Sequence, residues 1–371
     1  MKPVHYHLGA FPPNLDWSKL IALIGPANAA VARYAGLLEG MPSPTVLISP
    51  LMTQEAVISS RIEGTQATMG EVLELEAQGR LFDEDTEKKK DIGEVLNYRA
   101  ALNEAVRLLG SLPLSQRLIC DTHRVLMRGV RGRNKSPGEY RRIPNWIGPG
   151  GCTIENARFV PVLPNRLPDA MSAWETFLHS EQPDIFVQLA LIHAEFEAIH
   201  PFLDGNGRLG RLLIPLFLYN QRILPMPAFY LSAYFDRYRD EYYARLLSIS
   251  RDGDWTGWVS FFLTAIIDQA SENQTKILTA FKLYNDLKAK ITESAHSQFG
   301  IKALDWMFQR PIFNASDFRK NSGIPDQTAA RILRVCRNMG MIEVLHEASG
   351  RRPAIMWFPD LMAIAEGSDG V

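Results

Sequence analysis

The sequence contains only three cysteines in 371 residues, and they are far apart. Cys120, Cys152 and Cys336 form neither a disulfide framework nor a Cys-x-x-Cys metal site, so a reducing compartment is expected. No run approaches the ~18 consecutive apolar residues that suggest a membrane-spanning helix. The N-terminal stretch MKPVHYHLGAFPPNLDW has no apolar segment of the signal-peptide type. These absences predict a cytoplasmic protein without a membrane partner.

The chain also lacks a charge imbalance, internal repeats and low-complexity segments. Its 40 Lys and Arg residues nearly balance 41 Asp and Glu residues, and the formal net charge is −1. This balance gives no indication of a polyanionic partner for the chain as a whole. Apolar residues make up 46% and charged residues 22% of the sequence, which is typical of globular proteins. The length predicts two or three domains.

One dense polar stretch, HPFLDGNGRLGR, occupies residues 200–211. An apolar pattern of helical period precedes it over 184–199, and another follows over 209–220. Pro201 disfavours helical geometry at His200, so the first helix is expected to end there. The stretch therefore predicts a helix, a tight glycine-rich loop and the start of a second helix.

This arrangement suits a polyphosphate. Gly205 and Gly207 allow the backbone to turn sharply and to approach a ligand closely. The amides that open the second helix lack partners within it and carry its positive dipole end, so they can hold an anion. Arg208 and Arg211 share a helix face, and their guanidinium groups match phosphate oxygens.

Two further side chains add catalytic chemistry. Asp204 offers a hard oxygen ligand for Mg²⁺, which typically takes one or two carboxylates together with substrate phosphates. His200 lies beside the loop and is a candidate general base. A lone histidine, two arginines or a Gly-Asn-Gly turn is usually structural, but their combination in this order is specific. The stretch is not a Walker A loop, because the terminal Gly-Lys-Ser/Thr is missing.

Through this stretch, which matches HPFx[D/E]GNGRxxR without a break, the chain resembles the Fic family. Fic proteins are mainly α-helical enzymes that transfer the AMP part of ATP to a protein Ser, Thr or Tyr hydroxyl. The resemblance implies that His200 accepts the hydroxyl proton and that Asp204 holds Mg²⁺ between the α- and β-phosphates. It implies an anion hole of loop amides and two arginines that grip the β- and γ-phosphates. The implied ATP-binding residues of this stretch are Gly205, Asn206, Gly207, Arg208, Leu209, Gly210 and Arg211.

A second match lies upstream, where the letters SSRIEG begin at Ser59 and end an expected helix over 51–62. Ser59 and Glu63 share a helix face, and Gly64 can close the helix in left-handed geometry. Without context this is a surface glutamate before a capping glycine. It resembles the [S/T]xxxE[G/N] inhibitory motif of class II Fic proteins. The resemblance implies that Glu63 pairs with Arg211 and keeps the γ-phosphate from a productive position.

Residues 138–163 break the helical pattern and predict a β-hairpin around a Gly-Pro-Gly-Gly turn. An irregular surface hairpin is the alternative. The segment resembles the Fic flap, which registers a target segment by strand addition. The resemblance implies flap contacts at Ile147 and Val160.

A tyrosine-rich helix is expected over 230–249, where aromatic faces usually pack in a core. Its YYARL letters resemble a Fic stretch that lines the adenine pocket, which implies roles for Tyr242 or Tyr243 and for Leu246. Ser250 stands where the family often has Asn. His123 and His193 are interpreted as packing residues, and no third ligand near His193 supports a transition-metal site.

Residues 301–358 predict three helices and then two strands around 349–352, in the order of a winged helix-turn-helix. This segment has nine Lys and Arg residues against five Asp and Glu residues. DNA contact is one interpretation, and dimer contacts or target docking are the alternative. The basic side chains of the expected recognition helix and wing are Arg331, Arg334, Arg337, Arg351 and Arg352.

The predicted fold class is mainly α: a Fic-type helical bundle with a β-hairpin flap and a small C-terminal winged helix-turn-helix domain. Predicted domains are an N-terminal helical region over 1–110, a catalytic core over 111–295 and the winged domain over 296–371. The predicted function is an autoinhibited protein adenylyltransferase that uses ATP and Mg²⁺. Alternatives are a DNA-binding regulator with a nucleotide-sensing core and a de-AMPylating enzyme. The family also implies self-modification and a homodimer, and the target protein stays unknown.

Overall fold

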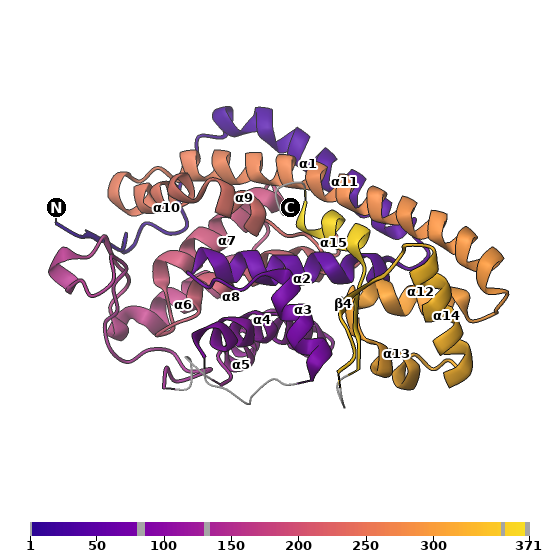
Figure 1. Cartoon of the computed structure of the whole chain (residues 1–371). Helices are drawn as coiled ribbons and strands as arrows, with labels where there is room; N and C mark the ends of the chain where they lie inside the picture. The colour runs from indigo at the N-terminus through magenta and orange to yellow at the C-terminus, as the bar shows by residue number, and fades with distance from the viewer. Residues whose placement is uncertain (1, 80–85, 130–133, 350–352, 368–371) are drawn as a thin grey trace. The chain divides into compact units, whose positions relative to one another are not determined.

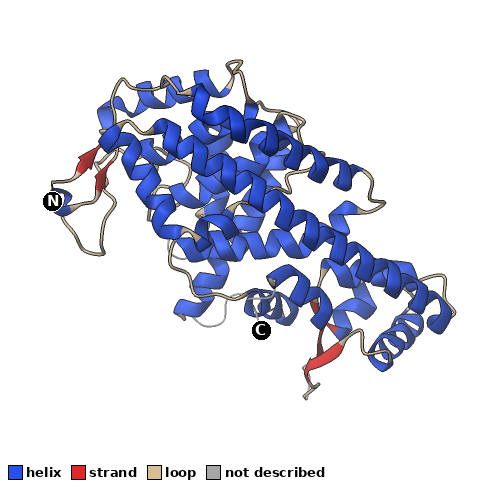
Figure 2. Ribbon diagram, turned by 90° about the horizontal axis from the view of Figure 1, so that it is seen from above, coloured by secondary structure: helices blue, strands red, loops and turns tan. Residues whose placement is uncertain are grey.

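The computed structural model describes residues 2–79, 86–129, 134–349 and 353–367 (Figure 1). Helices dominate these residues, and their strands form two small sheets (Figure 2). The predicted mainly-α class is therefore confirmed. The chain divides into two compact units: unit 1 comprises Met1–Gly36, Ile58–Gly64 and Asn97–Ser271, and unit 2 comprises Leu37–Val57, Thr65–Leu96 and Glu272–Val371. The units are discontinuous in sequence, and the three consecutive domains over 1–110, 111–295 and 296–371 stay a prediction.

Unit 1 is a helical bundle that contains the 200–211 stretch. Helices α1, α2, α4 and α11 each contain residues of both units. The helices with residues in unit 1 are α1 (Trp17–Glu39), α2 (Pro44–Ile62), α4 (Glu87–Leu109), α5 (Gln116–Leu126), α6 (Leu167–Leu178), α7 (Ile185–Ile199), α8 (Asn206–Asn220), α9 (Ser232–Arg237), α10 (Arg239–Asp252) and α11 (Trp255–Ala295). Its short elements are β1 (Val4–His5), β2 (Phe159–Val160) and the 3₁₀ turns Ile154–Asn156 and Pro164–Arg166.

Helix α7 lies in the core of unit 1, because its sequence is apolar on nearly every side. Two buried tryptophans from other helices bond to its backbone. The indole N–H of Trp174 donates to the carbonyl of Ile192 at 2.9 Å, and that of Trp258 donates to the carbonyl of Ala190 at 2.8 Å. These bonds and the surrounding apolar contacts hold the helix that precedes the glycine-rich loop.

The loop between α7 and α8 begins where the sequence predicts, and α8 starts three residues before the apolar pattern of 209–220. Helix α7 ends at Ile199, and His200 adopts left-handed geometry with a φ of 52° before Pro201. Helix α8 begins at Asn206. The predicted order of helix, loop and helix is therefore confirmed, and a six-residue loop separates two buried helices.

Helix α1 is the one helix among the described residues that is long and apolar enough to cross a membrane, a criterion that core helices also meet. One of its faces packs within unit 1. Ala27 and Val31 are fully buried, and the Tyr34 hydroxyl donates to the carbonyl of Ala228 at 2.5 Å. In this structure α1 is thus a partly buried helix with a packed and an exposed side.

Unit 2 contains the three-stranded antiparallel sheet, with strand order β3–β5–β4. Its remaining elements are α3 (Met69–Gln78), α12 (Gly300–Gln309), β3 (Ile312–Asn314), α13 (Ala315–Asn321), α14 (Asp326–Asn338), β4 (Glu343–His346), β5 (Ile355–Trp357) and α15 (Pro359–Glu366). The predicted helices and strands of 301–358 are present, and β3 was not predicted. The winged helix-turn-helix assignment stays a prediction.

The basic side chains of this segment differ in what the structure describes. Arg331, Arg334 and Arg337 are exposed on α14. Arg351 and Arg352, expected at the wing tip, lie outside the described residues. DNA contact therefore stays a prediction.

Replacing Asp184 with Ala should destabilise the protein by about 1 kcal/mol, as for other N-cap substitutions. Asp184 Oδ1 accepts from the backbone N–H groups of Phe186 and Val187 at 3.0 and 2.9 Å, so its loss leaves two donors of α7 unpaired. Urea unfolding followed by circular dichroism measures the change, with Asp184→Asn as the control that keeps a capping oxygen. Equal unfolding midpoints for Asp184→Ala and the unchanged protein would refute this role.

Candidate active site

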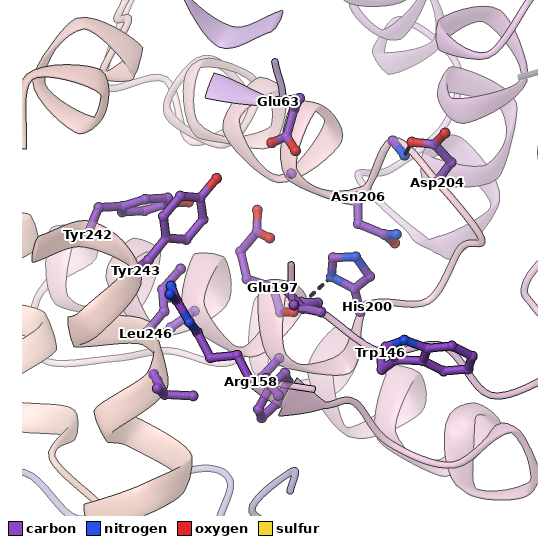
Figure 3. Close-up of a pocket in the computed structure, with 18 of the residues that line it drawn as sticks. Glu63, Trp146, Arg158, Glu197, His200, Asp204, Asn206, Tyr242, Tyr243 and Leu246 are labelled. Atoms are coloured by element: carbon purple, nitrogen blue, oxygen red, sulfur yellow. Dashed lines mark hydrogen bonds between the residues drawn. The ribbon is translucent and has the colours of Figure 1, made fainter. Parts of the chain in front are cut away.

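A cavity of about 550 Å³ in unit 1 brings together most of the residues predicted to form a site (Figure 3). Its volume is in the range of small-ligand pockets. Its walls come from the end of α2, α7, the 200–205 loop, α8, α10 and the segments 146–149 and 158–159. The predicted residues that line it are Glu63, Ile147, His200, Asp204, Gly205, Asn206, Gly207, Arg211, Tyr242, Tyr243 and Leu246.

The other predicted site residues lie outside this lining. Arg208 and Leu209 are buried, and the Arg208 guanidinium lies 3.4 Å from Asp204 Oδ1. Gly210 packs beneath Glu197, where an added Cβ atom would collide with the carboxylate. Buried Ser59 bonds to Arg211, and Val160 is buried in β2. The structure therefore gives Leu209 a core position and Val160 a strand position.

The glycine-rich loop is locked by the side chain of Asn206. Its Oδ1 accepts from the N–H of Phe202 at 2.8 Å, and its Nδ2 donates to the carbonyl of the same residue at 2.9 Å. Gly205 has a φ of +78°, and an added Cβ atom there would lie 2.7 Å from Met127 Sδ. Backbone conformation and space both favour glycine at this position. The first amides of α8 are thus held in fixed directions at the pocket.

His200 is a neutral imidazole with one available acceptor nitrogen. Its Nδ1 lies 3.2 Å from the carbonyl oxygen of Glu197, which can only accept, so Nδ1 carries the proton. This tautomer leaves the lone pair on Nε2. Burial lowers the pKa of His200 to about 4, while the carbonyl contact and the nearby carboxylates of Glu63 and Asp204 raise it. The side chain can therefore accept a proton at neutral pH.

Arg141 fixes the end of α7 that presents His200. The backbone N–H of Arg141 donates to the carbonyl of Pro201 at 3.0 Å. Its buried guanidinium donates to the carbonyls of His200 at 2.9 Å and Ile199 at 3.2 Å, and also to that of Val162. A cation at a helix C-terminus satisfies carbonyls that have no partner in the helix. Arg141 is a positioning residue that the sequence analysis missed.

His123, interpreted from the sequence as a packing residue, supports the loop from below. Its Nδ1 accepts from the N–H of Gly138 at 2.9 Å, so Nε2 carries the proton and donates to the carbonyl of Asp204 at 2.9 Å. The ring stacks on Phe202 with a centroid distance of 3.7 Å. Burial lowers the pKa of His123 to about 4. His123 thus orients Asp204 through its backbone.

Arg211 is held by two residues of the upstream SSRIEG segment, Ser59 and Glu63. Arg211 is 2% exposed. Its Nε donates to Ser59 Oγ at 2.9 Å, and one terminal nitrogen donates to the Ser59 carbonyl at 2.8 Å and to Glu63 Oε1 at 2.6 Å. Burial disfavours ionisation of the Glu63 carboxyl, but the charge and hydrogen bond of Arg211 outweigh this effect, so the pKa of Glu63 is lowered. The pair is therefore ionised at neutral pH.

The carboxylate of Glu63 lies over the first turn of α8. An added Cβ atom on Gly207 would collide with Glu63 Oε1. The N-terminus of a helix is where an external anion binds most readily. Glu63, whose side chain is 36% exposed, thus places a negative charge at the anion-binding end of the pocket.

Two additional contacts fix the backbone around Glu63. Arg61 pairs with Asp236 at 2.7 Å, and Arg239 donates to the carbonyl of Ile62 at 2.5 Å. Both partners of the α2 end come from the α9–α10 region. The position of Glu63 therefore depends on contacts outside its ion pair with Arg211.

Asp204 is the pocket carboxylate suited to a magnesium ion bound together with phosphates. Its side chain is 41% exposed, and Oδ1 accepts from the N–H of Gly205 at 2.6 Å. No group of three or more His, Cys, Asp or Glu side chains suited to a metal ion occurs in the described part of the chain. A single oriented carboxylate fits Mg²⁺, which takes its remaining ligands from phosphates and water.

The predicted flap is a minimal hairpin extended by the N-terminal segment. Ile147 and Phe159 form one antiparallel bridge, with N–H···O distances of 2.9 and 3.0 Å. On the other side of β2, β1 pairs in parallel, with Val4 opposite Phe159 and His5 opposite Val160. The backbone edge at Val160 therefore already pairs with β1, whereas Ile147 is 36% exposed and lines the pocket.

The aromatic side of the pocket rests on buried polar contacts. His193, also interpreted as a packing residue, donates from Nδ1 to the carbonyl of Gly210 at 3.1 Å and accepts from the Tyr242 hydroxyl at 2.9 Å. Burial lowers the pKa of His193 to about 3. Ser250 lies 2.7 Å from His7 Nδ1 and does not line the pocket.

Several pocket residues were missed by the sequence analysis. They are Trp146, Gly148, Pro149, Arg158, Phe159, Ala194, Glu197, Ala198, Leu203 and Leu247. Glu197 had a usable signal, because a residue three positions before His200 lies near it on the same helix face, and Ala194 lies three positions before Glu197. Trp146 and Arg158 come from the irregular hairpin, where periodicity gives no orientation.

Comparisons with known proteins agree with this geometry. The Fic/DOC family N-terminal model matches residues 21–107, and the Fic/DOC family model matches residues 113–218. A probable protein adenylyltransferase of Aquifex aeolicus is 32% identical over 83 residues, which are 22% of this chain and 26% of that protein. Protein adenylyltransferase Fic of Drosophila grimshawi is 28% identical over 209 residues, 54% of this chain and 38% of that protein. The chain thus spans well under half the length of these relatives.

Solved structures share the fold. A Fic family protein from Desulfovibrio desulfuricans G20 superimposes with a TM-score of 0.59 at 23% identity, over 94% of this chain and 98% of that one. Fic-1 from C. elegans gives 0.51 at 18% identity, over 71% and 76% of the two chains. The helical fold and the glycine-rich loop before α8 define a class of helical proteins. Together with the two family matches, they identify this chain as a Fic domain protein.

The imidazole of His200 should stay neutral from pH 8 down to about pH 5 and titrate near pH 4. An unfolded imidazole has a pKa of about 6.5, so it takes up a proton in this range that the folded one does not. The burial of His200 therefore lowers folding stability as the pH falls from about 6.5 to 4. Nitrogen NMR shifts of labelled histidine measure the tautomer and midpoint, with His200→Asn to assign the signal. A midpoint near 6.5 would contradict this environment.

Proposed function

We propose that this chain is a protein adenylyltransferase that transfers AMP from ATP to a Ser, Thr or Tyr hydroxyl of a target protein. The observation that carries the proposal is the geometry of one pocket. A neutral histidine with an available Nε2, the N-terminal amides of α8 and the buried Arg211 guanidinium all border it. The names of the relatives from Aquifex aeolicus and Drosophila grimshawi support the same reaction.

The reaction follows from these positions. His200 Nε2 takes the proton of the target hydroxyl as its oxygen attacks the α-phosphorus of ATP. A new P–O bond forms to the target, the bond between the α-phosphorus and the bridging oxygen breaks, and pyrophosphate leaves. The amides of Gly205, Asn206 and Gly207 stabilise the charge on the phosphate oxygens. Arg211 neutralises the β- and γ-phosphates, and Arg208, buried beside Asp204, adds positive charge near them.

Magnesium would be held by Asp204 together with the phosphates. The Gly205 N–H and the His123 contact orient the carboxylate and its backbone toward the loop. The ion would neutralise charge on the leaving pyrophosphate. The nucleoside would lie against the α10 side of the pocket, where Tyr242, Tyr243 and Leu246 form its wall.

Glu63 is the proposed inhibitory residue. Its carboxylate fills the space over Gly207 and pairs with Arg211. A terminal phosphate bound at α8 would need the same space and the same arginine. A bound nucleotide would have to give up this arginine or expel the carboxylate. The ion pair between Arg61 and Asp236 strengthens the inhibited arrangement by holding the turn in place.

The target segment would add as a strand beside residues 146–148. Trp146 and Ile147 are exposed at that edge, whereas β1 covers the opposite edge of β2. Backbone pairing demands little of the target sequence. A cytoplasmic location, self-modification and a homodimer are further parts of this proposal, and the C-terminal segment contacts DNA, a second copy of the chain or a target protein.

Glu63→Gly should raise AMP transfer above that of the unchanged protein, and adding His200→Ala should reduce it roughly 10²- to 10⁴-fold. The first change frees Arg211, and the second removes the base. Each variant is incubated with Mg²⁺, a cell lysate and ATP labelled at the α-phosphate, and label on protein is measured.

Glu39→Gly serves as a matched control, because Glu39 is an exposed glutamate at the end of α1 that does not line the pocket. It should leave labelling at the level of the unchanged protein. Absence of label from all variants, on the chain itself and on lysate proteins, would refute AMP transfer. Label that persists at full level in Glu63→Gly/His200→Ala would refute the role of His200.

A further inference from the structure

Glu197 is a half-buried acid in the pocket that the proposed reaction does not use. It lies on α7 one turn before His200, and its carboxyl projects into the middle of the pocket (Figure 3). Its Oε1 is buried and has no hydrogen-bond partner among the residues that the structure describes. Leaving a buried polar atom unpaired costs free energy, so such an atom needs an explanation.

The nearby Glu195 shows how this helix satisfies an acid that has a structural role. Glu195 Oε1 accepts from the Tyr6 hydroxyl at 2.5 Å, and Oε2 lies 2.8 Å from His7 Nε2. Both of its oxygens are thus paired within the protein. Glu197, two residues later, turns toward the cavity without such a partner for Oε1.

The backbone of α8 makes room for this carboxylate. Gly210 lies beneath it, and an added Cβ atom there would collide with Glu197 Oε1. Gly207, one turn earlier on α8, lies beneath Glu63 in the same way. Two acids therefore rest on two glycines of one helix, but Arg211 forms its ion pair with Glu63.

The charged surroundings of Glu197 leave it able to exchange a proton near neutral pH. Burial raises the pKa of its carboxyl to about 7, with Arg211 opposing and Glu63 adding to this shift. Tyr242 and Tyr243 face the site from α10, and His200 lies on its own helix. Both forms of the carboxyl retain an oxygen that can accept a hydrogen bond.

The location of Glu197 selects the part of a nucleotide that it would meet. The pocket is bordered by the N-terminus of α8, and its apolar lining includes Ala194 and Ala198 of α7 and Leu246 and Leu247 of α10. In Figure 3 Glu197 lies between Leu246 and His200. Ribose connects the phosphates to the base in any nucleotide, so phosphates at α8 bring the sugar to this middle position.

We propose that Glu197 accepts a hydrogen bond from a ribose hydroxyl, so that the pocket binds ATP more tightly than the analogue that lacks this hydroxyl. Acidic side chains bind ribose hydroxyls in this way in other nucleotide sites. The inference rests on the proposed function, because it takes the phosphates to bind at α8. It adds a residue that recognises the sugar, and a charge-assisted hydrogen bond gives it selectivity.

The test compares the binding of ATP, 2′-deoxy-ATP and 3′-deoxy-ATP, each with Mg²⁺, by isothermal titration calorimetry. The full chain carries Glu63→Gly to open the site and His200→Ala to prevent transfer. One of the deoxy nucleotides should bind about tenfold or more weakly than ATP, as expected for a lost hydrogen bond to a charged group. Adding Glu197→Ala should weaken ATP binding to the same level and make that deoxy nucleotide and ATP equivalent.

Glu197→Gln is the matched variant. Its amide oxygen can still accept a hydrogen bond from the hydroxyl, so this variant should keep part of the discrimination between nucleotides. If the alanine variant fails to fold, the test rests on two proteins. They are the Glu197→Gln variant and the chain that keeps Glu197, each titrated with the three nucleotides. Equal binding of all three nucleotides, or discrimination that survives Glu197→Ala, would overturn the role of Glu197 alone. Failure of every nucleotide to bind would overturn the proposed function and this inference with it.

Discussion

The pocket depends on a buried guanidinium that must be neutralised. Arg211 is 2% exposed, and a buried charge without a partner costs several kcal/mol. Ser59 and Glu63 satisfy it in the described structure. A polyphosphate would offer the same charge and the same kind of oxygen atoms. The observed arrangement and the proposed nucleotide-bound arrangement are therefore two ways of meeting one electrostatic requirement, and the proposed inhibition by Glu63 rests on this competition.

Burial controls the protonation states around this arginine. His123, His193 and His200 are all kept neutral by burial, and a backbone carbonyl fixes the proton of each on one nitrogen. The same lack of solvent raises the pKa of Glu197, whereas contact with Arg211 lowers that of Glu63. The two acids that pack against Gly207 and Gly210 of α8 thus differ in pKa because only Glu63 forms an ion pair with Arg211.

The sequence was sufficient where local rules decide the structure. Pro201 and the glycines predicted the end of α7, the loop and the start of α8, and Figure 1 shows these elements in that order. A motif resemblance supplied the pairing of Glu63 with Arg211, which are 148 positions apart. Periodicity alone could not have found it.

The missed features depend on tertiary contacts. Arg141 lies in an irregular segment, and its importance is visible only once four carbonyls surround its guanidinium. The pairing of β1 with β2 joins two-residue strands that carry no alternation to detect. Leu209 matched the motif but faces the core, because a helix that continues from a binding loop must also bury its apolar side.

The most direct measurement is a crystal structure of Glu63→Gly with Mg²⁺ and a non-hydrolysable ATP analogue. We predict that a terminal phosphate occupies the space over Gly207 that the Glu63 carboxylate fills here, with Arg211 paired to that phosphate. A nucleotide bound with its phosphates away from α8, or an Arg211 that keeps only its Ser59 contacts, would contradict the central claim that Glu63 and the nucleotide compete for one arginine.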